Sequence, residues 1–328
     1  NQRSICLLKL LKEYVKFIKN MKHFINLKDI RTVDLKKILK DAKKRKSKRK
    51  NLNTLDVDKD APLKGKILIQ MFEKPSLRTR LSFYLAIRQL GGGTITLRSN
   101  ELHLGKGGES LADTAKILST YGDGFMLRTD SDKKINEVVK YIKIPFINGL
   151  SPSSHPTQIL SDIFTVEEIK KKSISKLNIC WIGDSNNVLN SLIAASVKFS
   201  FKLNIGCPKN YKPKKIILDW VKKNKKSVYI YNDPKKAVKN ADVIFSDKVI
   251  SLNDKVNIKK KTKDFKKFLI DEKLLKLAPK SIFLHCLPRG NEVSNKVFLG
   301  KKSHVWQQAL NRVHVQKSIL MYCFNKLR

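Results

Sequence analysis

A dense group of cationic and hydroxyl side chains follows a short apolar run near the first quarter of the chain. Ser76, Arg78, Thr79 and Arg80 lie within five consecutive positions, directly after Pro75. Pro75 and Ser76 predict the start of a helix with Ser76 as its N-cap. The N–H groups of a first helical turn bind anions, and arginine recognises phosphate oxygens in a bidentate manner. The segment therefore predicts a site for a tetrahedral oxyanion such as phosphate.

Further motifs follow in the order of a known family. They are Ser76-Leu77-Arg78-Thr79-Arg80, His155-Pro156-Thr157-Gln158, Gly183-Asp184-Ser185-Asn186-Asn187, His285-Cys286-Leu287-Pro288 and Asn311-Arg312. They resemble the S-x-R-T-R, HPxQ, GD(G/S)NN, HCLP and late Asn-Arg motifs of the ornithine branch of the aspartate/ornithine carbamoyltransferase family. The resemblance extends from about Met21 to the end of the chain.

The resemblance implies a reaction. A carbamoyl group passes from carbamoyl phosphate to the side-chain amine of L-ornithine, giving citrulline and phosphate, a step of arginine biosynthesis. Positive groups around the leaving phosphate would stabilise the charge that develops there. The resemblance implies no cofactor, and the sequence contains no cluster with metal-ligand spacing. Two alternatives stay open, namely a carbamoyltransferase for putrescine, lysine or N-acetylornithine, and a basic binding homologue without catalysis.

The resemblance also assigns residues. The carbamoyl-phosphate site comprises Ser76, Leu77, Arg78, Thr79, His103, Arg128, His155, Gln158, Cys286, Leu287 and Arg312. The catalytic members of that set are Arg78, Arg128, His155, Gln158 and Cys286. The ornithine site comprises Asn187, Asp247, Ser251 and Leu252. His103 aligns with a residue that the family sends into a neighbouring subunit, which implies a homo-oligomer, typically a trimer, with shared active sites.

Local arguments support some of these roles. Arg128 follows an apolar run at 124–127, and ligands of open α/β sheets gather at the carboxyl ends of strands. His155 and Gln158 are three positions apart, so on a helix they share a face. Cys286 beside His285 is one arrangement of a nucleophilic thiol. Neighbours in a strand point to opposite faces, however, so we do not predict a covalent mechanism.

The chain departs from the family at three places. The family's D-x-W-x-S-M-G loop reads Asp247-Lys-Val-Ile-Ser-Leu-Asn253 here, Leu310 replaces the Glu before Asn-Arg, and Gly107-Gly108 adds one residue near His103. The loss of the loop glycine bears on closure over the second substrate. These departures affect the amino-acid side more than the carbamoyl-phosphate side.

The pattern of apolar runs predicts the elements that position these residues. Buried strands are expected at 67–72, 124–127, 144–147, 177–182, 203–205, 228–231, 243–245 and 282–285. Helical patterns lie between most of them, including 33–48 and a helix that reaches about Leu90 and stops at 91–93. Alternation of strand and helix predicts an α/β fold. We expect two domains, each a mostly parallel sheet flanked by helices, linked by interdomain helices.

The proline-containing stretch 151–156 predicts the boundary between the sheets. We expect a carbamoyl-phosphate-binding domain at 21–153, an ornithine-binding domain at 154–308, and a C-terminal helix at 309–328 that packs back on the first domain. Residues 1–20 form a basic amphipathic pattern. We interpret them as an N-terminal extension that lies upstream of the true start at Met21.

Composition excludes other classes. The 328 residues carry a formal net charge of +41, but the excess is spread along the chain and forms no single stripe. The charge run at 43–50 has no interleaved aromatic residues, so it predicts a solvated surface and no specific nucleic-acid partner. No apolar run reaches membrane-spanning length. The five cysteines form no CxxC pair, which favours a reducing compartment, and we expect a cytoplasmic protein without a membrane partner.

Overall fold

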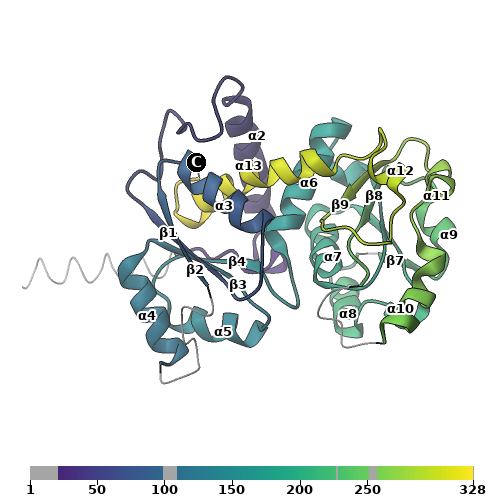
Figure 1. Cartoon of the computed structure of the whole chain (residues 1–328), viewed down its shortest axis with the longest axis horizontal. Helices are drawn as coiled ribbons and strands as arrows, with labels where there is room; N and C mark the ends of the chain where they lie inside the picture. Colours follow the sequence, from purple (N-terminus) through teal and green to yellow (C-terminus); the bar gives the residue numbers. More distant parts are fainter. Residues whose placement is uncertain (1–20, 99–108, 227, 251–256, 328) are drawn as a thin grey trace, which may run out of the picture. The chain divides into compact units, whose positions relative to one another are not determined.

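The computed structural model describes residues 21–98, 109–226, 228–250 and 257–327, which fall into two compact units (Figure 1). The first unit contains residues 21–25, 36–151 and 316–327, and the second contains 26–35 and 152–315. Helices α2 (Thr32–Ser47) and α13 (Val305–Cys323) each contribute residues to both units. Among the described residues, no helix is long and apolar enough to cross a membrane.

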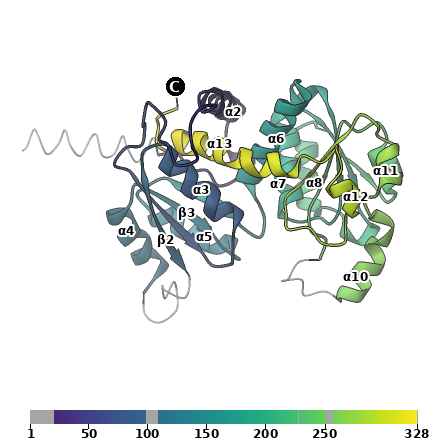
Figure 2. The same cartoon turned by 45° about the horizontal axis from the view of Figure 1, so that its top comes forward.

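The first unit is built on a parallel sheet of four strands in the order β2-β1-β3-β4. Besides part of α2, its elements are β1 (Ile67–Phe72), α3 (Arg78–Gln89), β2 (Gly93–Arg98), α4 (Leu111–Tyr121), β3 (Gly124–Arg128), α5 (Asp132–Tyr141) and β4 (Phe146–Leu150). Met71, Phe125 and Leu127 of the sheet pack with Leu118 of α4 and Val138 of α5. Helices α4 and α5 lie next to each other on this face (Figure 2).

The second unit is built on a parallel sheet of five strands in the order β7-β6-β5-β8-β9. Its helices are η1 (Leu27–Asp29), α6 (Pro156–Lys170), η3 (Ile174–Lys176), α7 (Asn187–Phe199), η4 (Lys209–Tyr211), α8 (Lys215–Lys223), α9 (Pro234–Val238), α10 (Ile258–Phe265), η5 (Lys266–Phe268), α11 (Glu272–Lys276) and α12 (Asn295–Phe298). Its strands are β5 (Asn178–Ile182), β6 (Lys202–Gly206), β7 (Val228–Tyr231), β8 (Val243–Ser246) and β9 (Ile282–His285).

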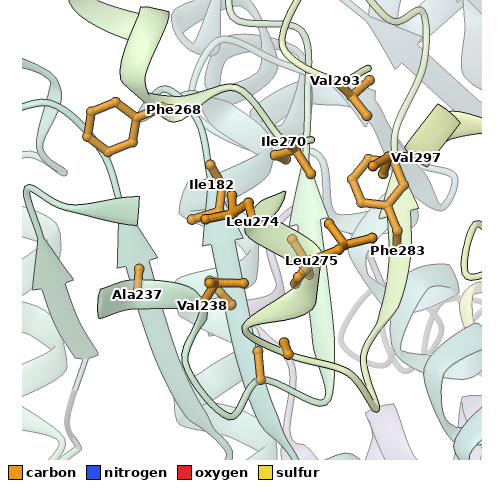
Figure 3. Packing of buried hydrophobic residues seen from close by; sticks show 14 of the residues in the cluster. Ile182, Ala237, Val238, Phe268, Ile270, Leu274, Leu275, Phe283, Val293 and Val297 are labelled. Carbon is orange, nitrogen blue, oxygen red and sulfur yellow. The ribbon is translucent and has the colours of Figure 1, made fainter. Parts of the chain in front are cut away.

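One face of the second sheet is covered by short helices. Ile182 of β5 and Phe283 of β9 belong to the same buried cluster as Val238 of α9 and Leu274 and Leu275 of α11 (Figure 3). Short helices suffice here because each contributes only one or two apolar side chains to a continuous core.

The strand order of each sheet reverses once. In the first sheet the chain passes from β1 to β2 on one side and then to β3 on the other side of β1. In the second sheet it passes from β5 through β6 to β7, and then to β8 on the other side of β5. Loops that leave the carboxyl ends of strands at such a switch point run apart, and ligands bind there. Each unit therefore has one expected site, after β1 and β3 or after β5 and β8.

The expected α/β class is confirmed, since both sheets are parallel and helices separate their strands. One strand was not predicted, and several predicted bounds differ from the observed ones. Strand β2 was not predicted, because Gly91–Gly93 indicated only the end of a helix, whereas Gly93 begins β2. The strand expected at 144–147 is β4 at Phe146–Leu150, and β3 includes Arg128 instead of ending before it. The extension at 1–20 lies outside the described residues.

Candidate functional site

The switch point of the first unit joins Ser76 to Arg128. Helix α3 begins at Arg78, and Leu77 occupies its N-cap without a side-chain hydrogen bond, so the prediction that Ser76 is the N-cap was wrong. The Ser76 hydroxyl instead accepts a hydrogen bond of 3.2 Å from Nη1 of Arg128. The reason is that β1 and β3 are neighbours, so the loop after β1 meets the last residue of β3. Thr79, in the first turn of α3, is buried.

Two guanidinium groups concentrate positive charge at this switch point. Burial, followed by the charge of Arg78, lowers the pKa of Arg128 to about 10. The Nε of Arg128 is buried and has no hydrogen-bond partner among the described residues. A bound dianion would offset both penalties, because it would stabilise the two cations and accept from that nitrogen. The N-terminus of α3 adds N–H groups that have no partner within the helix.

A buried carboxylate fixes the strand ends that carry this site. The backbone N–H of Glu73 donates to the carbonyl of Arg128 at 2.9 Å. The Glu73 side chain accepts from the Thr129 hydroxyl and forms an ion pair of 2.6 Å with Lys134. These contacts hold the loop after β1 against the end of β3. The sequence analysis did not identify Glu73, whose signal is its place directly after a buried strand.

The His155 motif lies in the second unit at the start of α6. His155 is the N-cap of this helix, with φ −134° and ψ 68°, and Pro156 is its first residue. The prediction that His155 and Gln158 share a helix face was therefore wrong, because proline favours the first helical position and leaves His155 outside the helix. His155 is buried, and its backbone N–H donates to Ser191 Oγ at 2.8 Å.

Gln158 joins a buried group that also contains Arg312. The carbonyl oxygen of Gln158 accepts from Nη1 of Arg312 in a short hydrogen bond. The amide nitrogen of Gln158 donates to Asp162 at 2.8 Å, and so does that of Gln308. The structure thus brings together Gln158 and Arg312, as the assigned set requires, and adds Asp162 and Gln308. The sequence signal for both is that each lies four positions from an assigned residue on a helix.

The switch point of the second unit joins the loop after β5 to Asp247. Gly183 has φ +151°, a conformation that favours glycine. Asn186, which the sequence analysis did not single out, is the N-cap of α7 and accepts from the N–H groups of Val188 and Leu189. Its amide nitrogen donates to Asp247 at 2.7 Å. Asn187 is the first residue of α7. The preference of Asn for N-caps is the signal that identifies Asn186.

Asp247 sits in an environment that disfavours its charge. Burial raises its pKa, and Glu292 adds to the shift, although His285 and the hydrogen bond from Asn186 act in the opposite direction. Ammonium ions pair with such carboxylates, because an opposite charge at close range stabilises the ionised form. This side chain follows β8 directly, at the carboxyl end of the strand.

The ring nitrogens of His285 are both engaged. Nδ1 accepts from the Leu287 N–H at 2.9 Å, and Nε2 lies 3.1 Å from Glu292. Because Nδ1 accepts this bond, Nε2 is the nitrogen that donates to Glu292. Burial raises the pKa of Glu292, but hydrogen bonds from His285 and Gly290 outweigh it and lower that pKa overall. His285 therefore has no nitrogen left to activate the buried thiol of Cys286.

The turn after β9 contains a strained residue. Leu287 has φ +58°, which side chains other than glycine rarely adopt. Its N–H is held by His285, as described above. The Cys286 N–H donates to the Ser246 carbonyl at 3.4 Å, which places this turn beside the end of β8.

Three assigned residues, His103, Ser251 and Leu252, lie outside the described residues. Within the part of the chain that is described, no group of three or more His, Cys, Asp or Glu side chains could hold a metal ion.

Comparison with known proteins agrees with the motifs. The family model of the aspartate/ornithine carbamoyltransferase carbamoyl-P binding domain matches residues 22–168, and that of the Asp/Orn binding domain matches residues 175–323. Ornithine carbamoyltransferase of Brucella suis is 41% identical over 306 residues, which are 92% of this chain and 96% of the relative. That of Rhizorhabdus wittichii is 39% identical over 307 residues, which are 93% of this chain and 98% of the relative.

Solved structures give the same result. Ornithine carbamoyltransferase from Pyrococcus furiosus superposes with a TM-score of 0.86 at 36% identity, covering 94% of this chain and 98% of that one. The anabolic enzyme from Campylobacter jejuni superposes with a TM-score of 0.84 at 35% identity, covering 93% and 100%. The chain belongs to the aspartate/ornithine carbamoyltransferase family.

Proposed function

We propose that this chain transfers the carbamoyl group of carbamoyl phosphate to the side-chain amine of L-ornithine. The neutral amine attacks the carbonyl carbon, the bond from that carbon to the phosphate oxygen breaks, and the amine nitrogen loses a proton. The products are citrulline and phosphate. The chain is an enzyme of carbamoyl transfer, and the named relatives and solved structures favour ornithine over other acceptors.

The observation that carries this proposal is the pair of guanidinium groups at the first switch point. Arg78 and Arg128 repel each other, and burial of Arg128 adds to the cost of its charge. A phosphate dianion compensates such a cost, and it is the leaving group of the reaction. We assign Ser76, Leu77, Arg78, Thr79 and Arg128 to the phosphate, with the first turn of α3 adding N–H donors.

The second unit supplies the remaining groups in this proposal. We assign His155, Gln158, Cys286, Leu287 and Arg312 to the carbamoyl end of the substrate. The imidazole of His155 is suited to a carbonyl oxygen that becomes negative during attack, because an imidazole N–H can donate a hydrogen bond to it. For the domains, we propose a carbamoyl-phosphate-binding domain at 21–153, an ornithine-binding domain at 154–308, and a C-terminal helix at 309–328 that belongs with the first domain.

The acceptor is held by the second switch point. We assign Asp247 to the α-ammonium of ornithine, and Asn187, Ser251 and Leu252 to the rest of its amino-acid end. The buried carboxylate of Asp247 gains a cation when ornithine binds. Arginine biosynthesis is the matching role, and the Campylobacter jejuni relative is named as anabolic.

Acceptor preference tests this assignment. Putrescine lacks both the α-carboxylate and the α-ammonium, so it would leave buried groups unpaired at about 1–3 kcal/mol each. Lysine keeps both groups but adds a methylene, which costs about 1–3 kcal/mol in a fitted pocket. We expect kcat/KM to be highest for L-ornithine, lower for lysine and N-acetylornithine, and lowest for putrescine. A higher value for putrescine or N-acetylornithine would refute the acceptor and leave the phosphate site untouched.

Substitution of Arg78 tests the donor site. Charge-assisted hydrogen bonds contribute about 1.5–3 kcal/mol each, so Arg78→Leu should abolish carbamoyl-phosphate binding by calorimetry and citrulline formation. Arg88→Leu is the matched control, since Arg88 is exposed in the last turn of the same helix. Normal binding by Arg78→Leu, or equal losses in both variants, would refute the phosphate assignment.

Two further features belong to the proposal. We infer that the enzyme is a homo-oligomer, a trimer by its family, in which His103 of one subunit completes the site of its neighbour. We also infer a cytoplasmic location, which matches Cys180, Cys207 and Cys323, three cysteines of the described part of the chain that form no disulfide bond.

A further inference from the structure

Four side chains of the second unit form one continuous file of hydrogen bonds. Arg312 donates to Gln158, Gln158 donates to Asp162 at 2.8 Å, and Gln308 donates to the same carboxylate oxygen, Oδ1, at 2.8 Å. The file ends at the backbone of β9, where the His285 N–H donates to the carbonyl oxygen of Gln308 at 2.9 Å. It thus connects the His155 motif on α6, the Asn-Arg motif on α13 and the His-Cys motif after β9.

The chemistry of the two end groups fixes the direction of every bond in the file. A guanidinium only donates, so the atom of Gln158 that faces Arg312 must be its oxygen. A backbone N–H only donates, so the atom of Gln308 that faces His285 must likewise be its oxygen. Both amide nitrogens therefore point at Asp162, and these orientations do not depend on how the amides were assigned. Asp162 is the acceptor that satisfies both.

The file is closed to water. Gln158, Asp162, Gln308 and Arg312 each expose 2% or less of their surface. Because water cannot replace a lost partner there, an amide nitrogen without an acceptor would be expensive. Asp162 has capacity beyond its two bonds, since its Oδ2 is buried without a hydrogen-bond partner among the described residues. An Asn at this position would keep an oxygen for both donors and place its NH₂ group where Oδ2 lies.

We propose that Asp162 is a positioning residue that makes Gln158 present an acceptor oxygen to the donor substrate and thereby selects a ligand with an N–H group beside its carbonyl. The inference rests on the proposed function, and it adds the determinant of donor specificity. A Gln158 oxygen has two lone pairs, of which Arg312 takes one, so the other can accept from the NH₂ of a carbamoyl group. Acetyl phosphate has a methyl group at that place and offers no donor.

Removal of Asp162 would release this constraint. The nitrogen of Gln158 would lose its acceptor, and the amide would no longer be held at both ends. Arg312 would keep its own hold on the oxygen, so substrate binding should weaken without being abolished. The loss should fall on the carbamoyl NH₂ and spare the contacts assigned to the phosphate.

The test compares two donors that differ at one group. We would measure the dissociation constant of carbamoyl phosphate and that of acetyl phosphate, and take their ratio as the discrimination. In Asp162→Leu this ratio should fall about tenfold, the equivalent of one hydrogen bond. Asp162→Asn should stay within about threefold of the wild type, because both amides keep their acceptor. The KM for L-ornithine should change little in either variant.

Two further variants keep the test decisive. Ser161→Ala is the matched control, because Ser161 is the buried neighbour on α6 and its hydroxyl donates to the Thr157 carbonyl. Its ratio should equal that of the wild type. If Asp162→Leu does not fold, Asp162→Ala removes the same acceptor with a smaller side chain, and the ratio should again fall about tenfold. An unchanged ratio in Asp162→Leu or in Asp162→Ala, or a tenfold loss in Asp162→Asn, would overturn the proposal.

The outcome is separable from that of the proposed function. Failure of the wild type to form citrulline would refute the function. Citrulline formation by the wild type together with an unchanged ratio in the variants would refute the role of Asp162 alone.

Discussion

Two buried carboxylates, Asp58 in the first unit and Asp162 in the second, are both contacted by α13 but by different kinds of partner. Asp58 pairs with Arg45 at 3.1 Å, Arg49 at 2.8 Å and Lys317 at 2.6 Å. Among the described residues Asp162 forms no ion pair, and its two donors are neutral amides. The first arrangement balances charge and fixes architecture, whereas the second leaves charge uncompensated and fixes the direction of hydrogen bonds.

The consequences of this difference appear in the titration of each group. Burial lowers the pKa of Lys317 to about 8, with the nearby arginines adding to the effect and Asp58 opposing it. Burial raises the pKa of Asp162 to about 7, although Gln308, Gln158 and Arg312 oppose it. Asp58 is thus surrounded by three cations. Asp162, between two neutral amides, has a pKa close to neutral pH.

Removal of the charge of Asp58 tests how much its ion pairs contribute to the stability of the first unit. Asp58→Asn leaves three cations facing each other in a buried site, and removal of one partner of a buried ion pair costs about 3–5 kcal/mol. We expect that loss in the free energy of unfolding, measured by urea denaturation. Asp60→Asn is the control, because Asp60 is more than half exposed and also pairs with Arg45. It should cost about 0–1 kcal/mol. Equal costs would show that burial of the cluster is unimportant.

The pH dependence of stability tests the raised pKa of Asp162 in the second unit. The pKa of Asp162 is about 7 in the folded chain and near 3.8 when unfolded, so the native state binds the proton more tightly. Stability from this group is present in full below about pH 4 and is lost as the pH rises through about 7. Asp162→Asn removes this loss.

The measurement is the difference in unfolding free energy between Asp162→Asn and the wild type at several pH values. It should grow in favour of the variant between pH 4 and 7, by up to about 1.4 kcal/mol for each pH unit. Other titrating groups cancel in the difference. Parallel curves for the two proteins would contradict the raised pKa.

The sequence predicted the fold class because parallel strands that are buried on both faces appear as continuous apolar runs. It could not predict strand order, which depends on packing between distant segments. Ser76 and Arg128 are 52 positions apart, and only the neighbouring positions of β1 and β3 bring them together. Strand β2 was missed because it lies at the edge of the sheet, where its alternating pattern is weak and glycine precedes it.

The residues of the candidate site that stand within family motifs could be predicted from the sequence. The residues that hold those side chains in place could not. Arg78 and Gln158 stand within motifs, whereas Asp162 and Gln308 do not, and a buried Asp on a helix gives no signal of its partners. Asn186 illustrates the middle case. Its place before α7 predicts a cap, but its bond to Asp247 crosses 61 positions and required the structure.

The partners that α13 supplies have a consequence for how the chain folds. Lys317 lies 259 positions from Asp58, and Gln308 lies 146 positions from Asp162. Bringing the ends of such long segments together costs conformational entropy before the contacts form. Each doubling of the segment length adds only about 0.6 kcal/mol to this cost of loop closure. Neither carboxylate has all of its native partners until α13 docks, so both units should acquire their final buried polar contacts in one late and slow step.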